Sequence, residues 1–263
     1  MILTVDIGNS RISLAVFDKE GKLAFSSNLS SVENRSDDEY VVLIRGILDM
    51  YGLKHSSVEG AIVSSVVPPL SNVIERAIIK LFGCKPLFVG PGIKTGLDIK
   101  VDHHYQLGAD LVANTVAASA VYTKPFIIID MGTATTVTAV NGKGELCGVI
   151  IIPGARIALD ALSKNAAELP QISLTPPKAL LGTNTVDAMS SGIIYGTACM
   201  IDGLINRLCE EFNIDQITAI ATGGLASLFI PYCKHKLIYS PNLIFDGLYL
   251  LYKMNNKKYR HIN

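Results

Sequence analysis

Two short segments place an aspartate and a glycine directly after an apolar run. In TVDIGNS, residues 4–10, Asp6 ends the run, and in IIDMGTA, residues 128–134, Asp130 does the same. A strand that ends in Asp and continues into Gly puts a carboxylate at a sheet edge beside backbone N–H groups, with no side chain to block a phosphate. Such a site can hold a nucleotide phosphate and Mg²⁺ together. One Asp-Gly is also a common turn, but two copies, with the glycines of ATGG after a third strand, favour the phosphate site.

Both segments lie where β-hairpins are expected. The apolar runs 2–6 and 12–17 flank a tip at Gly8 to Ser10, and the runs TTVTAV and ELCGVII flank the turn NGKG. The repeat therefore predicts two matching lobes. Apolar periodicity predicts the other elements. We expect strands over 60–66, 86–89, 126–130 and 217–221, and helices over 37–52, 70–82, 107–123, 154–165, 185–211, 223–230 and 242–255.

The composition restricts the class of partner. Of 263 residues, 49% are apolar, so a large core is expected, and the 23 basic and 23 acidic residues leave no charge excess for nucleic acid or anionic lipid. The five cysteines form no CxxC pair, which argues against a zinc site or a disulfide framework. MILTVDIGN lacks the basic region of a signal peptide, and Pro153 interrupts the apolar stretch 146–155. We expect a cytoplasmic protein without a membrane span that binds small molecules.

The arrangement of the Asp-Gly loops and the Gly pair resembles the acetate kinase, sugar kinase and actin superfamily. Within it, the chain resembles the type III pantothenate kinase family over some 220 residues, in segments such as PGIKTGL, LGAD and GTNTVDAM that other superfamily kinases lack. The matching segments lie at 6–13, 64–70, 91–97, 107–110, 129–136, 148–170, 182–196 and 221–226. The resemblance implies an α/β fold with two actin-like (ribonuclease H-like) lobes, mixed sheets flanked by helices, over residues 1–115 and 116–263.

The resemblance also implies which residues bind ATP and metal ions. Thr133 in the second loop is similar to an ATP contact, Asp6 lies near Mg²⁺, and Asp130 matches the carboxylate that holds an activating monovalent cation, K⁺ or NH₄⁺. From the residues alone, Asp130 could instead end a strand in a turn, although its repeat relation to Asp6 argues otherwise. The first ATP phosphate loop would comprise Asp6, Ile7, Gly8, Asn9, Ser10, Arg11, Ile12 and Ser13.

On the substrate side, Asp110 in LGAD matches the family's catalytic base. Phosphoryl transfer needs a carboxylate that accepts the proton of the attacking hydroxyl. Two alternatives remain open, because Asp110 and Thr185 each precede or open a helical pattern and could be helix N-caps. In the family, the threonine that matches Thr185 contacts pantothenate across a dimer interface. The substrate-binding positions implied by the resemblance are Val101, Gly108, Ala109, Asp110, Leu111 and Thr185.

Two of these positions depart from the family pattern. Leu111 stands where the family has an arginine, and Val101 stands where it has a tyrosine. An arginine is the natural partner of the pantothenate carboxylate. The departures affect the expected substrate more than the expected kinase chemistry.

Three functions follow from these observations. The first is ATP-dependent phosphorylation of the primary hydroxyl of pantothenate, the first step of coenzyme A biosynthesis. The second is a kinase for a related hydroxyl compound. The third is a catalytically weak regulatory paralogue that binds nucleotide. In each case we expect a homodimer, because the segment 182–205 is too apolar around its circumference for a solvent-facing helix.

Overall fold

The computed structural model describes residues 1–103 and 107–256. Its strands form two sheets, and the chain divides into two compact units. The first unit contains Met1–Leu97, Asp102–Ala120 and the segment from Leu243 onward, and the second contains Asp98–Val101 and Val121–Asn242. Each unit is thus made of segments that are not contiguous in the sequence. The lobe boundary at residue 115 remains a prediction.

The first unit is built on a five-stranded sheet in the order β3-β2-β1-β4-β5. β1 and β2 pair antiparallel as the predicted hairpin, and β4 lies parallel to β1. Nearly every residue of β1 and β4 is buried, as expected for central strands with both faces covered. The strands are β1 (Ile2–Ile7), β2 (Arg11–Phe17), β3 (Leu23–Ser30), β4 (Gly60–Ser65) and β5 (Leu87–Phe88).

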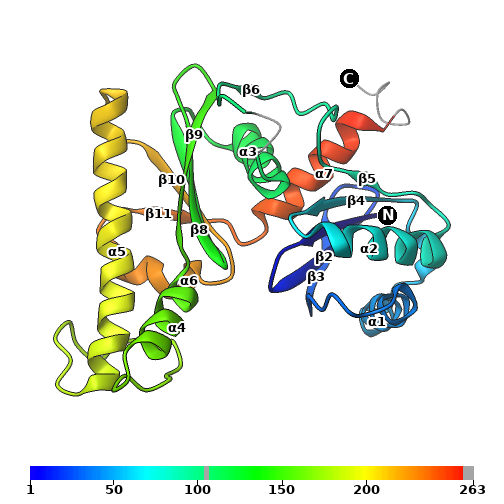
Figure 1. The fold of residues 1–263 in the computed structure, drawn as a ribbon. Coiled ribbons are helices and arrows are strands. Elements are labelled where there is room, and N and C mark those ends of the chain that lie inside the picture. The colour runs from blue at the N-terminus through cyan, green and yellow to red at the C-terminus, as the bar shows by residue number, and fades with distance from the viewer. Residues whose placement is uncertain (104–106, 257–263) are drawn as a thin grey trace. The chain divides into compact units, whose positions relative to one another are not determined.

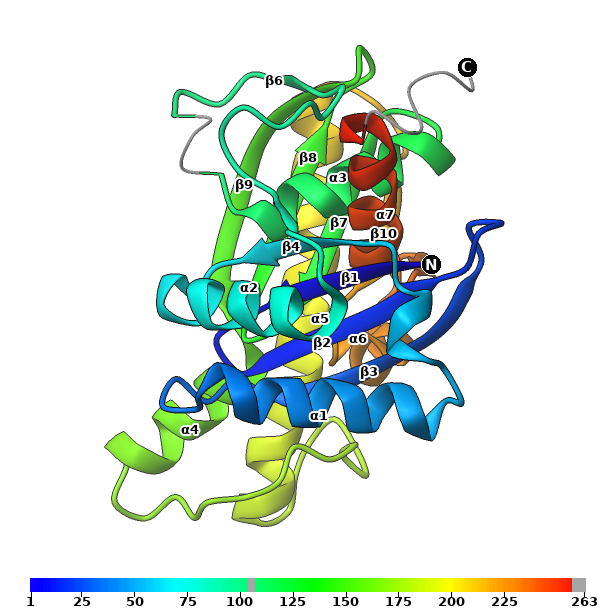
Figure 2. The same ribbon diagram turned by 90° about the vertical axis from the view of Figure 1, so that its right-hand side faces the viewer.

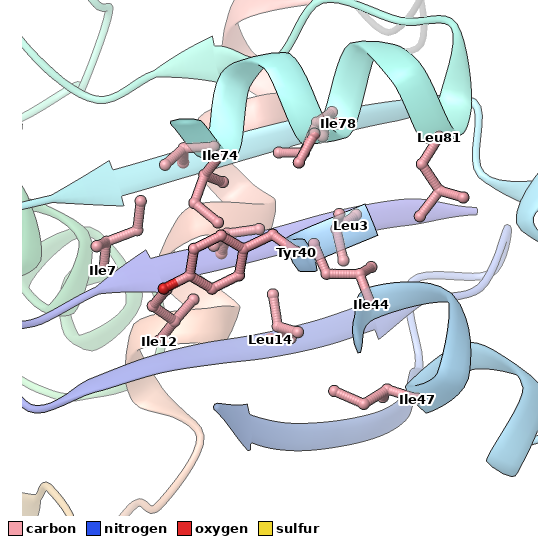
Figure 3. Close-up of a cluster of buried hydrophobic side chains, with 14 of the residues drawn as sticks. Leu3, Ile7, Ile12, Leu14, Tyr40, Ile44, Ile47, Ile74, Ile78 and Leu81 are labelled. Carbon is pink, nitrogen blue, oxygen red and sulfur yellow. The ribbon is translucent and has the colours of Figure 1, made fainter. Parts of the chain in front are cut away.

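Helices cover both faces of this sheet (Figure 1). On one face lie α1 (Asp37–Met50), which begins with a capping box, and α2 (Pro68–Phe82), which ends at a left-handed glycine. Figure 3 shows the core on this face, where Leu3, Ile7, Ile12 and Leu14 of the hairpin meet Tyr40, Ile44, Ile47, Ile74, Ile78 and Leu81 of the helices.

The opposite face carries α3 (Ala109–Val121) and α7 (Leu243–Asn255). Ile2 and Ile62 of the sheet pack with Ala113 of α3 and Leu248 of α7. The two helices touch through Gly247, where a side-chain carbon would overlap the carbonyl group of Ala113. Asp6 lies near the end of β1 on this same face of the sheet. Ile2, which precedes it on that face, is covered by α3 and α7.

The second unit repeats this design. Its sheet has the order β11-β10-β7-β8-β9-β6, and its first five strands correspond in order and direction to β5-β4-β1-β2-β3. The repeat predicted from the two Asp-Gly segments is therefore present in the sheets. The strands are β6 (Asp98–Ile99), β7 (Phe126–Met131), β8 (Ala134–Val140), β9 (Glu145–Pro153), β10 (Thr218–Thr222) and β11 (Leu237–Tyr239).

One face of the second sheet is covered by α4 (Ala155–Asn165), α5 (Thr185–Phe212) and α6 (Ala226–Phe229). Figure 1 shows α5 as the longest of these helices, and in Figure 2 it lies behind the strands of the second sheet. In the described part of the chain, α5 alone is long and apolar enough to cross a membrane. Core helices of globular proteins pass the same test, and one side of α5 is buried against the sheet. Sites on the opposite sheet face, including Asp130, are not covered by these helices.

The structure also departs from the predicted elements. β3, β6 and β11 were not predicted, because the first is polar along an edge and the others are two and three residues long. The helix expected from residue 223 begins only at Ala226, since Gly223 has φ of +91° and forms a turn. A 3₁₀ turn at Ile230–Tyr232 continues it, and another lies at His55–Ser57.

Candidate active site

The loop between β1 and β2 is held in place by three hydrogen bonds. The backbone N–H of Gly8 donates to the carbonyl of Arg11 at 2.9 Å and closes the turn. Ser31, which follows β3, donates its hydroxyl to the Gly8 carbonyl at 2.6 Å and its N–H to the Ser10 carbonyl at 3.2 Å. The loop is therefore shaped before any ligand arrives, as a phosphate-binding loop needs to be.

The residues of the predicted first loop divide by exposure. Ile7 and Ile12 are 0% exposed and anchor the two strands in the core. Asn9, Ser10 and Arg11 are exposed at the tip. The segment can thus present polar groups to a ligand without loosening the sheet.

Asp6 belongs to a row of polar side chains that crosses the first sheet. It is in register with Ser13 on β2 and with Ser64 on β4, and Ser13 is in register with Asn28 on β3. Ser13 donates its hydroxyl to Oδ1 of Asn28 at 2.8 Å. Oxygen ligands of this kind are what Mg²⁺ prefers, usually one or two carboxylates completed by water and phosphate. The row fits that ion.

Asp130 occupies the corresponding place in the second sheet. It is in register with Thr136 on β8 and Thr222 on β10. The N–H of Gly132 donates to the carbonyl of Ala134 at 3.1 Å and closes the loop that carries Thr133. The matching threonines and the closed turn make this row a second candidate cation and phosphate site.

The backbone of two glycines packs closely against the second loop. A side-chain carbon at Gly223, the first glycine of ATGG, would overlap Oδ1 of Asp130, and one at Gly154 would overlap the carbonyl of Thr133. Gly223 also needs glycine for its φ of +91°. The sequence singled out the ATGG pair, but only the fold shows that its first glycine shapes the surroundings of Asp130.

Asp110 lies in the first turn of α3, as its second residue. The helix begins one residue earlier, because the Gly108 carbonyl already accepts the N–H of Val112 at 3.1 Å. The alternative that Asp110 is an N-cap is therefore wrong. Its Oδ1 accepts the N–H of Leu111 at 2.9 Å and lies over Gly108, where any side chain would collide with it.

Burial changes the chemistry of Asp110. Loss of water around the carboxylate raises its pKa above the ordinary value, and hydrogen bonds from the Leu111 and Asp110 backbone offset part of that rise. A carboxylate with a raised pKa holds a proton more strongly than an exposed one. It is therefore the better general base for an alcohol at neutral pH.

The remaining predicted substrate residues lie in different surroundings. Leu111 is buried, with 8% of its surface exposed, while Gly108 and Ala109 are half-buried. Val101 belongs to the second unit, unlike Asp110. Thr185 is exposed at the start of α5, and its alternative as an N-cap is also wrong, because Asn184 is the cap and accepts the N–H of Asp187 at 2.9 Å. Each unit therefore carries its own share of the predicted residues.

Four polar members of the two rows, Asn28, Ser64, Thr136 and Thr222, are not among the site residues predicted from the sequence. They become neighbours of the predicted residues only through strand register. Asn28 lies outside every matching segment, whereas the other residues lie within such segments, which alone assign them no role. The sheet order would have been needed to find them.

Comparisons with known proteins identify the family of the chain. The profile of the type III pantothenate kinase family matches residues 2–207. A type III pantothenate kinase from Bacillus cytotoxicus is 43% identical over 255 residues, which is 97% of each chain.

Solved structures with little sequence identity share the fold. A protein from Campylobacter jejuni described as a Baf family transcriptional activator has a TM-score of 0.60 at 21% identity, covering 96% of this chain and 98% of that one. The activator of 2-hydroxyisocaproyl-CoA dehydratase from Clostridium difficile, with bound ADPNP, has a TM-score of 0.56 at 15% identity, covering 95% and 93%. The fold is that of the actin-like ATPases, and the chain belongs to the type III pantothenate kinase family.

Proposed function

We propose that the protein transfers the γ-phosphate of ATP to the primary hydroxyl of pantothenate and forms 4′-phosphopantothenate. The observation that carries the assignment is the partly buried Asp110 in the first turn of α3, in a chain of this family. The Asp110 carboxylate accepts the hydroxyl proton as the oxygen attacks the γ-phosphorus. The bond between that phosphorus and the bridging oxygen breaks, and ADP leaves.

The two loops hold the nucleotide. Asp6 to Ser13 bind the phosphates through exposed backbone N–H groups and the polar tip, and Thr133 makes a further contact. Mg²⁺ at Asp6 and a monovalent cation at Asp130, K⁺ or NH₄⁺, neutralise phosphate charge when they are bound. Support comes from the equivalent positions of both carboxylates at the ends of β1 and β7.

The substrate carboxylate needs a cation that position 111 does not supply. Lys100 is already paired, with 3.0 Å between Nζ and the Asp98 carboxylate. Lys94 has a fixed backbone instead, because its N–H and carbonyl both bond to the Asn255 amide, at 2.9 and 2.8 Å. We assign Lys94 as the candidate partner, since an ordered loop lowers the entropic cost of holding its charge in place.

A kinase for a related hydroxyl compound is the second candidate, and buried Leu111 favours it. An apolar side chain at this position suits a substrate without a carboxylate there. The regulatory paralogue is the third, and the raised pKa of Asp110 argues against it.

We further propose a homodimer through α5. Small exposed residues, Ala188, Gly192, Gly196 and Cys199, follow one another along the helix at spacings of three or four. Such a surface permits close helix packing. Leu181, just before α5, is 83% exposed, which is unusual for a surface that stays in water. Light scattering should give the dimer mass at micromolar concentration. A monomer with full activity would contradict both the interface and a site shared through Thr185.

The other partners are small molecules. Equal numbers of acidic and basic residues leave no charge excess for nucleic acid or anionic membranes. We propose that the protein works in the cytoplasm.

One assay tests the assignment. ATP consumption by the purified protein should be measured with pantothenate, pantetheine and simple sugars as acceptors, in potassium buffer with Mg²⁺. Pantothenate should be preferred. Turnover of another acceptor alone would establish the second candidate, and nucleotide binding without turnover of any acceptor would establish the third.

A further inference from the structure

Ser64 is a buried serine whose hydroxyl has no hydrogen-bond partner. It is 0% exposed, and its Oγ contacts no donor or acceptor within bonding distance. Buried hydroxyls in folded proteins are nearly always paired, because burying one without a partner forfeits its bonds to water. The serine therefore needs an explanation beyond the packing of β4.

The neighbouring serine shows that the region does not lack partners. Ser65 points to the other face of the sheet, where its Oγ accepts the N–H of Val67 at 3.1 Å and the hydroxyl of Ser71 at 2.7 Å. The two adjacent serines thus differ in their hydrogen bonding. Ser65 is satisfied by the fold, and Ser64 is not.

The unpaired hydroxyl lies beside Asp6. The two residues are in register on parallel strands, about 4.8 Å apart, and their side chains are on the same face. On the other side of Asp6, the Ser13 proton is already given to Asn28. Of the two hydroxyls that flank Asp6, only that of Ser64 still has all its bonding capacity.

We propose that Ser64 positions the Mg²⁺ of Mg·ATP by accepting a hydrogen bond from a water molecule on that ion. The inference deepens the proposed function, since it rests on Asp6 as the Mg²⁺ carboxylate. Mg²⁺ in nucleotide sites keeps several of its waters, and each bound water is a strong donor that needs an acceptor. Ser64 is then a positioning residue, because it acts through a water and not on the reacting atoms.

The proposal predicts opposite effects of Ser64→Ala on the free and the loaded protein. In the free protein the change removes an unsatisfied group, so the melting temperature should stay equal or rise. In the loaded protein it removes one hydrogen bond, so the affinity for Mg·AMPPNP should fall by about fivefold to tenfold. A serine with a purely structural role would lower the melting temperature and leave affinity unchanged.

Calorimetric titration of the full chain with AMPPNP, in Mg²⁺ and in EDTA, separates the possibilities. We expect the loss for Ser64→Ala in Mg²⁺ and equal affinities of both proteins in EDTA. Ser65→Ala is the matched control, with a lower melting temperature and unchanged nucleotide affinity, because its bonds belong to the fold. Ser64→Thr keeps the hydroxyl and should bind Mg·AMPPNP within about twofold of wild type; the equivalent position of the second sheet carries Thr222.

Three results would overturn the proposal. They are an unchanged affinity of Ser64→Ala in Mg²⁺, an equal loss with and without Mg²⁺, and a Ser64→Thr variant as weak as the alanine. Because no pantothenate is present, these outcomes are independent of which acceptor the enzyme phosphorylates. Failure of the acceptor assay would leave the titration informative, and the reverse also holds.

Discussion

The two sheets place an aspartate at the same point of the same topology, yet the surroundings differ. Asp6 lies in a row that continues through Ser13 to the polar Asn28, whereas the row of Asp130 continues through Thr136 to Ile151, which is 72% exposed. A repeated fold therefore supplies two carboxylates but not two identical sites. The first row offers oxygen atoms over a wider area, as a hydrated ion requires.

The loops that follow the two aspartates also differ, in length. The hairpin of the first sheet has four residues, 8–11, between its last paired positions, and that of the second has three, 132–134. Glycine backbone also lies directly against Asp130. We expect the tighter second loop to favour an ion that sheds more of its water, which suits a monovalent cation better than Mg²⁺.

The largest expected effect compares two acidic helix starts. Asp110 and Asp246 each lie in the first turn of a helix, α3 and α7, and burial raises the pKa of both. Asp110→Asn should lower turnover by roughly two to four powers of ten with nearly unchanged ATP binding, because only the general base is lost. Asp246→Asn should keep turnover within about threefold, since no reacting group is removed. If Asp110→Asn kept more than a third of wild-type turnover, Asp110 would not be the base.

The second prediction removes the carboxylate of each row in turn. Asp6→Asn should raise the Mg²⁺ concentration for half-maximal activity by about tenfold to a hundredfold, and Asp130→Ala should remove most of the advantage of potassium over sodium. Initial rates at matched ionic strength measure both. Each variant serves as the control for the other. Identical cation responses of the two variants would mean that the rows do not hold different ions.

A third prediction concerns position 111, which lies in α3 and not in either of the two loops compared above. Leu111→Arg, preferably with Val101→Tyr, should lower the pantothenate KM severalfold and up to about 150-fold, because one charge-assisted hydrogen bond is restored. The KM for ATP should change little. The free variant should melt lower than wild type, since an unpaired guanidinium would replace a buried leucine. A higher pantothenate KM in the variant would show that Leu111 is part of a rebuilt pocket.

The smallest effect is one of stability. The pKa of Asp110 is higher in the folded protein than in the unfolded chain, where it is about 3.9. The unfolding free energy of wild type therefore falls as the pH rises from about 3.9 through the pKa of the folded protein. Asp110→Asn should therefore melt above wild type at pH 7, by about 2–4 °C for each kcal/mol regained, and the difference should disappear below about pH 4. Thermal melts from pH 3.5 to 8 measure it. A variant that melts lower at pH 7 would contradict the burial argument.

The sequence predicted the elements that carry strong periodicity. Both hairpins, the buried strands and the long helices follow from patterns of apolar residues, and Asp6 and Asp130 could be named because their loops repeat. Ser64 could not, because its neighbours depend on β4 pairing with β1 across more than fifty residues of chain. β3 escaped because an edge strand needs few apolar residues, and LAFSSNLS has few.

Helix α7 comes last in the second repeat but packs in the first unit. Tyr249 stacks on Phe17 with ring centroids 4.5 Å apart, and Tyr252 fills the space that a side chain at Gly60 would take. During synthesis the first sheet emerges early, and the part of its face that α7 covers stays open until residue 255 has left the ribosome. Its apolar face is exposed to chaperones and to aggregation in that interval. A nonsense mutation before residue 243 should consequently leave not a working amino-terminal half but a product for the cell's proteases.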